Sequence, residues 1–180
     1  MKKYSKKSYP VEDARHFLEP TPTVLVTSAY KGEQNIMTMG WYTIMEFKPS
    51  LIGCMISSGN HSFELIRKSK ECVIIIPTLE LSQTVVAIGN CSGADVDKFN
   101  EFDLDIKDGD LVKAPLLENC FANFECRLYN NKLIKDFNFF IFEIVKAHVA
   151  TSPKYPKTIQ YRGESHFVES GRNFIIPSSK

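Results

Sequence analysis

The sequence has no long apolar run. No segment approaches the roughly 20 consecutive apolar residues that span a bilayer, and the N-terminus lacks the apolar core of a signal peptide. The five cysteines are an odd number and include no Cys-x-x-Cys pair, which argues against a disulfide framework. We therefore expect reduced thiols, a cytoplasmic location and no membrane partner.

The sequence also has almost no net charge. Its 22 Lys and Arg residues nearly balance 21 Asp and Glu residues, for a formal charge of +1. No global electrostatic case exists for binding nucleic acid or an anionic membrane. Four lysines lie among residues 1–9, which we expect to form a flexible basic tail. The length of 180 residues suits one domain, 1–180, with a sizeable core.

Several catalytic and metal-binding motifs are missing. No Gly-Lys-Ser/Thr, Gly-x-Gly-x-x-Gly or Gly-x-Ser-x-Gly sequence occurs, so a P-loop is excluded, and a Rossmann site and a serine hydrolase are unsupported. No metal site is predicted, because none of the histidines pairs with another at ligand spacing: His16, His61, His148 and His166. Cys91 is the one loop cysteine that could react, but no neighbouring base activates it, and we give it no role.

Most of the sequence consists of short β-branched and apolar runs, separated by turns that contain Gly, Pro or Asn. They predict strands at 23–29, 34–38, 42–46, 51–56, 71–77, 119–128, 137–149 and 173–176. Helices are expected at 10–18, 63–68 and 81–88, the last closed by Gly89, with a short helical segment in 95–102. Residues 161–163 read as a turn. This pattern predicts a mainly β protein with short helices, a barrel or sandwich rather than a parallel α/β sheet.

The stretch from Gln34 to Ser62 is the main candidate for a site. It sets the polar residues Asn35 and Thr38 among apolar ones and contains Trp41, the single tryptophan. The loop Ser-Ser-Gly-Asn-His-Ser at 57–62 then opens a helix, whose unpaired N–H groups favour an anion. A planar, polar-edged, phosphorylated ligand would suit such a pocket. Ordinary helix capping by a polar loop is the alternative for residues 57–62.

Lys98 is the charged candidate. It follows the Ser92-Gly93 loop and precedes Phe99, a residue that should be buried. A lysine supplies a point charge on a long stem, which suits a phosphate. The alternative is a solvated surface lysine, which describes most lysines.

Three segments together resemble a known family. They are Asn-x-x-Thr-x-x-Trp at 35–41, the loop 57–62 leading into Phe-Glu-Leu-Ile, and Ser-Gly-x-x-x-Asp-Lys-Phe at 92–99. In this order they are similar to the flavin reductase–like proteins, most closely the flavoredoxin type. The similarity runs from about residue 20 to 167.

The resemblance implies an FMN-binding split β-barrel that holds the flavin non-covalently, usually near a homodimer interface. Asn35 and Trp41 would lie against the flavin, Thr38 would bind the ring edge, and an aromatic residue of the segment 161–167 would close over the ring. Lys98 and the loop residues Ser57 to Ser62 would hold the phosphate. The implied cofactor-binding residues are Asn35, Met37, Thr38, Trp41, Ser57, Asn60, His61, Ser62, Lys98 and Phe167. No catalytic side chain is implied, because the chemistry lies at flavin N5.

The sequence departs from the family at one point. Family members often carry Asp-His before the long strand after the hairpin, and here the pair is Asp136-Phe137. Three functions stay open. The first is an oxidoreductase that passes electrons through FMN between NADH, NADPH or another donor and an acceptor. The second is an electron carrier with little NAD(P)H activity, acting with a redox partner protein. The third is a flavin-free ligand-binding barrel.

Overall fold

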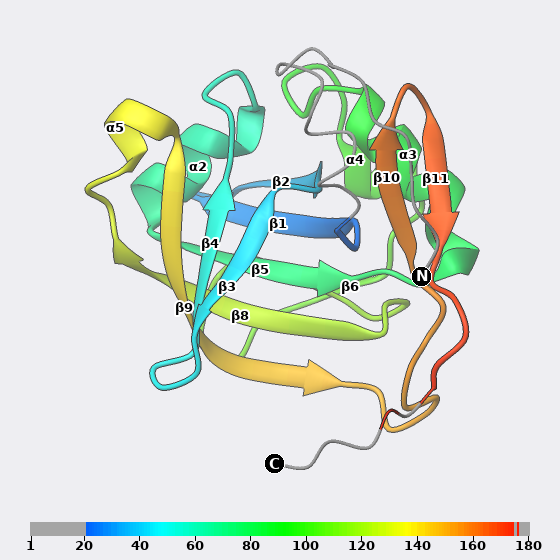
Figure 1. Ribbon diagram of the computed structural model, residues 1–180. Helices are drawn as coiled ribbons and strands as arrows, with labels where there is room; N and C mark the ends of the chain where they lie inside the picture. The colour runs from blue at the N-terminus through cyan, green and yellow to red at the C-terminus, as the bar shows by residue number, and fades with distance from the viewer. Residues whose placement is uncertain (1–20, 175, 177–180) are drawn as a thin grey trace, which may run out of the picture.

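The computed structural model describes residues 21–174 and 176, and the tail and helix predicted for 1–18 lie outside them. Its centre is an antiparallel seven-stranded sheet in the order β2-β1-β5-β8-β9-β4-β3 (Figure 1). The strands are β1 (Val24–Tyr30), β2 (Glu33–Met39), β3 (Tyr42–Glu46), β4 (Leu51–Met55), β5 (Glu71–Ile76), β8 (Ala122–Asn130) and β9 (Phe139–Val149). The prediction of a mainly β protein with short helices is confirmed. The sheet is not closed into a barrel, since it begins at β2 and ends at β3.

Strands β1 and β5 are mostly apolar because both of their faces are covered. Successive strand residues point to opposite faces. In β5, Cys72 and Ile74 enter one buried cluster, and Val73 and Ile75 enter the other. β1 alternates in the same way. The sheet therefore separates two hydrophobic cores.

The helices cover the two faces near β1 and β2. Helix α2 (His61–Ser69) buries Phe63 and Ile66 in one core, and α3 (Ser82–Asn90) buries Val85 and Ile88 in the other. The other helical segments are η2 (Leu79–Leu81), α4 (Lys98–Glu101) and α5 (Ile134–Phe137). None of the helices in the described part of the chain is long and apolar enough to cross a membrane.

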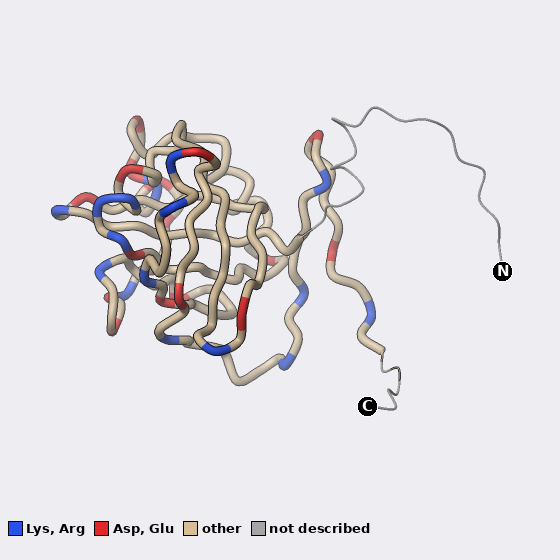
Figure 2. The backbone as a smooth tube through the Cα atoms, turned by 60° about the vertical axis from the view of Figure 1, so that its left-hand side comes forward, with Lys and Arg blue, Asp and Glu red and all other residues tan. Residues whose placement is uncertain are grey.

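Two small sheets complete the structure: β6 (Ile106–Lys107) with β7 (Leu116–Leu117), and β10 (Ile159–Gly163) with β11 (His166–Glu169). The β10–β11 hairpin forms an arm beside the main sheet (Figures 1 and 2). Backbone hydrogen bonds fix its root, from Thr23 N to Ile159 O at 2.8 Å and from Leu79 N to Lys157 O at 2.9 Å. Figure 2 also shows acidic and basic residues interspersed along the chain, as the balanced composition leads one to expect.

Four local predictions were wrong. Gly89 does not end α3, which runs on to Asn90. An added Cβ at Gly89 would lie 3.3 Å from the Thr38 Cβ, so the glycine lets the helix approach β2. Residues 161–163 are strand, and the turn comes after them, where Glu164 and Ser165 have φ of 50° and 61°.

The third error concerns the C-terminal segment. Residues 173, 174 and 176 form no strand, because no neighbouring strand pairs with them among the described residues. In addition, the connection between β8 and β9 contains α5, so Phe137 ends a helical turn and does not begin the strand.

Candidate functional site

A buried polar network fixes Asn35 on β2. The Asn35 Nδ2 donates to the Ser62 Oγ at 2.9 Å, and the Ser28 Oγ donates to the same oxygen at 3.1 Å. All three side chains are buried. A Cβ at Gly93 would lie 2.1 Å from the Asn35 Oδ1, so only glycine allows the 91–97 loop to come this close. The amide is thus held between α2 and that loop.

Helix α2 begins beside this network without a side-chain cap. Asn60 occupies the N-cap position with an extended backbone but makes no capping hydrogen bond, and its Nδ2 donates to the Ser57 O at 3.4 Å. The Ser57 Oγ instead accepts from the Gly59 N at 3.3 Å. Apart from the Phe63 N–H, which donates to the Asn60 O at 3.0 Å, the first-turn N–H groups of this nine-residue helix keep their capacity to bind an anion.

Lys98 brings a buried cation to the same place. Its side chain is only 4% exposed, and its Nζ donates to the Ile88 O near the end of α3 at 2.8 Å. An ammonium has three protons, so two remain for other acceptors. Burial lowers the pKa of the Lys98 ammonium, and the neighbouring Cys91 opposes that shift. The alternative of a solvated surface lysine does not hold, because the side chain is buried.

These groups line one cavity of about 290 Å³. Asn35 and Met37 of β2, Asn60 and His61 at the start of α2, and Lys98 all face it. The His61 Nε2 lies 2.6 Å from the Glu33 Oε1, which fixes the imidazole at the rim. Gly59, the end of α3 and the loop residues 91–93 after it form the remaining wall. Five of the ten predicted cofactor residues thus meet in one place.

A second cavity of about 320 Å³ shares Gly89 and Asn90 with the first. Thr38 and Phe167, two further predicted residues, line it together with Thr23 and Tyr161. The Thr38 Oγ1 donates to the Val85 O at 2.6 Å, so this hydroxyl holds α3 against β2. The Tyr161 and Phe167 rings lie 5.1 Å apart at 47° and form an aromatic wall on the hairpin arm.

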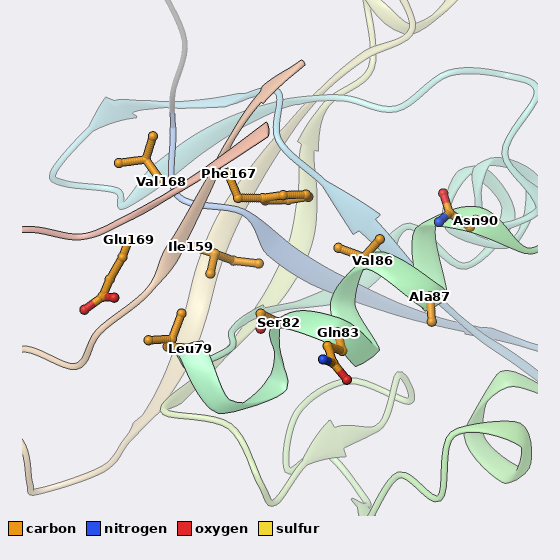
Figure 3. A pocket seen from close by; sticks show the side chains of 10 residues that line it. All are labelled: Leu79, Ser82, Gln83, Val86, Ala87, Asn90, Ile159, Phe167, Val168 and Glu169. Atoms are coloured by element: carbon orange, nitrogen blue, oxygen red, sulfur yellow. The ribbon is translucent and has the colours of Figure 1, made fainter. Parts of the chain in front are cut away.

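A third and larger cavity, of about 650 Å³, adjoins the second through Val86, Asn90 and Phe167. Figure 3 shows its side chains, which come from the η2–α3 segment and from the β10–β11 arm. Most of them are apolar, and Glu169, which pairs with Lys157, is the only ionisable one. Because neighbouring cavities share residues of α3, we refer to the three together as the groove along α3, with Lys98 at one end and mostly apolar side chains at the other.

Three of the predicted residues do not line these three cavities. Ser62 is fully buried and acts through Asn35, Ser57 is exposed in the loop, and Trp41 is half exposed and bonds through its backbone to Met55. Phe137, which replaces the family histidine, is 66% exposed and lies outside the groove.

Sequence reasoning missed two parts of the groove. Gly89 lines two of the cavities and Asn90 lines all three, whereas the sequence predicts Gly89 only as a helix end and gives Asn90 no role. Thr23 was taken only as the start of a strand. The signal for Gly89 was available, because a glycine inside an apolar helical pattern indicates close packing. No sequence signal marked Thr23.

A second polar cluster lies elsewhere, around the fully buried Glu125 of β8. The Glu125 carboxylate accepts from the N–H groups of Asp110, Leu111 and Val112 at 3.2, 2.6 and 2.9 Å, and contacts the His148 Nε2 at 2.7 Å. Asp110, Glu125 and His148 have ligand atoms within 4.8 Å of one another. Each is already paired, Asp110 with Lys146, so the cluster serves to hold the 109–112 loop to the sheet.

Comparison with known proteins decides the family. The sequence pattern of the flavin reductase like domain matches residues 16–168. The chain belongs to this family. An uncharacterized protein of Archaeoglobus fulgidus is 32% identical to this flavin reductase–like chain over 165 residues, which are 91% of the chain and 92% of the relative.

Solved structures share the fold. Flavoredoxin of Desulfovibrio vulgaris (Miyazaki F) superposes with a TM-score of 0.80 at 22% identity, over 99% of this chain and 98% of that one. An FMN-binding domain of a flavin reductases–like enzyme from Shewanella baltica OS155 gives 0.79 at 24% identity, over 87% and 89%. The flavin reductase–like chain therefore has the fold of these proteins, including the flavoredoxin type.

Proposed function

We propose that the flavin reductase–like chain binds FMN non-covalently in the groove along α3 and acts as an oxidoreductase. One observation carries the proposal: a buried lysine ammonium and an uncapped helix N-terminus face the same cavity. Family membership and the FMN-binding and flavoredoxin structures of the same fold support it.

The residues present fit such a cofactor. Lys98 and the backbone N–H group of His61 would hold the phosphate by charge-assisted hydrogen bonds. Asn35 and Met37 line the same cavity and would contact the adjoining part of the molecule. A phosphorylated group is the anion that this end of the groove suits best, because its charge balances a buried lysine that has no carboxylate partner among the described residues.

The central cavity would receive the planar ring. Its walls are Thr38 and the Gly89 backbone on one side and the Tyr161–Phe167 pair on the other. When bound, FMN supplies the redox chemistry, and the protein supplies binding, orientation and electrostatics. The aromatic arm would exclude water from this cavity, and the Thr38–Val85 bond would keep its floor rigid.

The larger apolar cavity adjoins that of the ring and is the proposed place of the second reactant. NADH, NADPH or another donor would deliver electrons there, and an acceptor would remove them. An electron carrier that uses a partner protein in place of NAD(P)H is the second candidate. The flavoredoxin fold favours it.

Titration of the purified protein with FMN tests the proposal. We expect a yellow protein with flavin absorption bands, or quenching of FMN fluorescence with a Kd of about 1 μM or lower, a range reached by pockets that bury most of a ligand. Anaerobic addition of NADH or NADPH then separates the two candidates, because bleaching of the flavin shows direct reduction and an unchanged spectrum favours the carrier. Failure of FMN to bind at millimolar concentration would contradict both and leave the flavin-free barrel.

We also propose a homodimer formed through β3. This strand ends the sheet and exposes four of its five residues. Ile44 and Met45 are 62% and 45% exposed, and the adjoining Phe47 is 85% exposed. An exposed apolar edge strand promotes association unless it is covered, and a second copy of the same chain would cover it.

Ile44→Lys is expected to convert the dimer to a monomer, because it places a charge in the buried centre of the contact. The measurement is the molar mass by sedimentation equilibrium. Ile106→Lys provides the matched control, since Ile106 is also a partly exposed strand isoleucine, at 43%, but lies on β6. A monomeric wild type, or a dimer that survives Ile44→Lys, would rule out β3 as the interface.

A further inference from the structure

Among the residues that the structure describes, none forms a hydrogen bond with the Thr23 hydroxyl. Within the described part of the chain, its Oγ1 is the one buried side-chain oxygen or nitrogen without a bond. The Thr23 side chain is 3% exposed. Buried polar groups in folded proteins nearly always have partners, because leaving one unmatched costs stability. An exception at a cavity wall calls for a partner that comes from outside the chain.

Thr23 stands at a wall of the central cavity, the one proposed for the ring. Its backbone is fixed there, because its N–H donates to the Ile159 O at 2.8 Å and the preceding Pro22 is bridged to Gln160. Only the side chain is adjustable. A rotation of about 120° about χ1 brings the hydroxyl of a threonine to the staggered position that its methyl group or its Cβ hydrogen occupied before.

The other threonine of this cavity is already committed. The Thr38 Oγ1 donates to the Val85 O at 2.6 Å and holds the helix. The Asn35 amide lies in the neighbouring cavity and is bonded to Ser62. Among the three, Thr23 alone keeps both the donor and the acceptor of its side chain for a ligand.

We propose that the Thr23 hydroxyl recognises the polar edge of the ring bound in the central cavity, through a ring carbonyl or a ring N–H. This inference rests on the proposed FMN function and adds to it the residue that forms a hydrogen bond with the polar edge of the ring. A ring with carbonyl and N–H groups along one edge is favoured over an all-carbon ring of equal size. The unmatched hydroxyl lowers the stability of the ligand-free protein. When the ring binds, the hydroxyl gains a hydrogen bond, which increases the affinity for the ring.

The test is Thr23→Val, which removes the hydroxyl and keeps the shape. Its two expected effects have opposite signs. The ligand-free variant should melt about 2–4 °C higher than wild type, because an unmatched buried hydroxyl is replaced by a methyl group. Its Kd for FMN should rise about 3- to 10-fold, because one hydrogen bond to the ring is lost. Thr23→Ser retains the hydroxyl and should bind FMN within about 2-fold of wild type, since an equivalent bond can form.

Lumiflavin has the ring but no ribityl phosphate, so it shows whether Thr23→Val weakens binding through the ring or through the phosphate. Thr23→Val should weaken lumiflavin and FMN by the same factor. Equal lumiflavin affinity in wild type and Thr23→Val overturns the inference while FMN binding stands, and so does a lower melting temperature for Thr23→Val. If wild type binds neither flavin, the proposed function fails and this inference fails with it.

Discussion

Lys98→Met is expected to weaken FMN binding about 10- to 100-fold, the value of one or two hydrogen bonds to a charged group. The methionine keeps most of the buried stem and removes the ammonium. Riboflavin, which has no phosphate, should bind to the variant within about 3-fold of its wild-type affinity, as nothing in its structure needs the charge. The measurement is a fluorescence titration with both flavins.

The riboflavin titration matters because Lys98 has a second role. Its Nζ donates to the Ile88 O, and lysines near a helix C-terminus commonly satisfy the last carbonyl groups. If that were its only function, Lys98→Met would weaken FMN and riboflavin alike. Lys132→Met, an exposed lysine in the β8–β9 connection, is the control and should leave both affinities unchanged.

The pH dependence of FMN binding should follow the same residue. Because burial lowers the pKa of Lys98, the ammonium is lost at a lower pH than an ordinary lysine loses it. FMN affinity should therefore fall as pH rises through that folded-state pKa. The stability of the ligand-free protein should change in the opposite sense, since the unfolded state then binds the extra proton and stability rises with pH. Both trends should vanish in Lys98→Met.

The largest loss of stability is expected from Glu125→Ala, about 2–4 kcal/mol in the free energy of unfolding. The substitution leaves three backbone N–H groups of the 109–112 loop without their acceptor and removes the partner of His148. Chemical denaturation measures the loss. FMN affinity should stay within about 3-fold of wild type, because Glu125 lies outside the three cavities of the groove. Glu118→Ala, at an exposed acidic residue, should cost less than about 0.5 kcal/mol.

The Glu125 carboxylate also predicts an acid transition. Burial alone would raise the pKa of Glu125, but the hydrogen bonds from His148 and from the backbone N–H groups outweigh it and hold the pKa below its usual value. A carboxylate with a lowered folded-state pKa stabilises the fold above its unfolded pKa, and the contribution is lost as pH falls through the folded pKa. Wild type should thus lose more stability than Glu125→Ala between about pH 5 and that lower pKa. Parallel curves for the two proteins would contradict this role.

The sheet could be predicted from the sequence because its strands carry strong local signals. β1 and β5 are continuous β-branched and apolar runs, and β3 lies where alternation placed it. The errors occur where tertiary packing overrides a local preference. Glycine is typical of a helix end, but Gly89 lies inside α3, where the absence of a side chain lets the helix approach Thr38. The turn at Glu164 and Ser165 uses positive φ in residues that rarely adopt it, and composition cannot show that.

The candidate site was predicted in part. Residue type and family resemblance indicated Asn35, Asn60, His61 and Lys98, and the structure places all four at one cavity. The extent of the groove could not be predicted, because its other wall is the arm from residues 159–169, more than 60 residues further along the chain than Lys98. Ser62 shows a different limit. Its type suggests a ligand contact, but its position inside α2 turns its hydroxyl towards Ser28 and Asn35.

Helix α3 contributes to all three cavities, and this has a consequence for how the family can diversify. Val85 and Ile88 anchor the helix in the core, whereas Ser82, Gln83, Val86 and Ala87 face the apolar end of the groove. Val86 also lines the central cavity, but Ser82, Gln83 and Ala87 do not, so exchanges at these three positions would change the size and polarity of the apolar end without altering the other two cavities. Substitutions within this one nine-residue helix could therefore change which reactant binds at the apolar end, while the residues of the two cavities proposed for the cofactor stay the same.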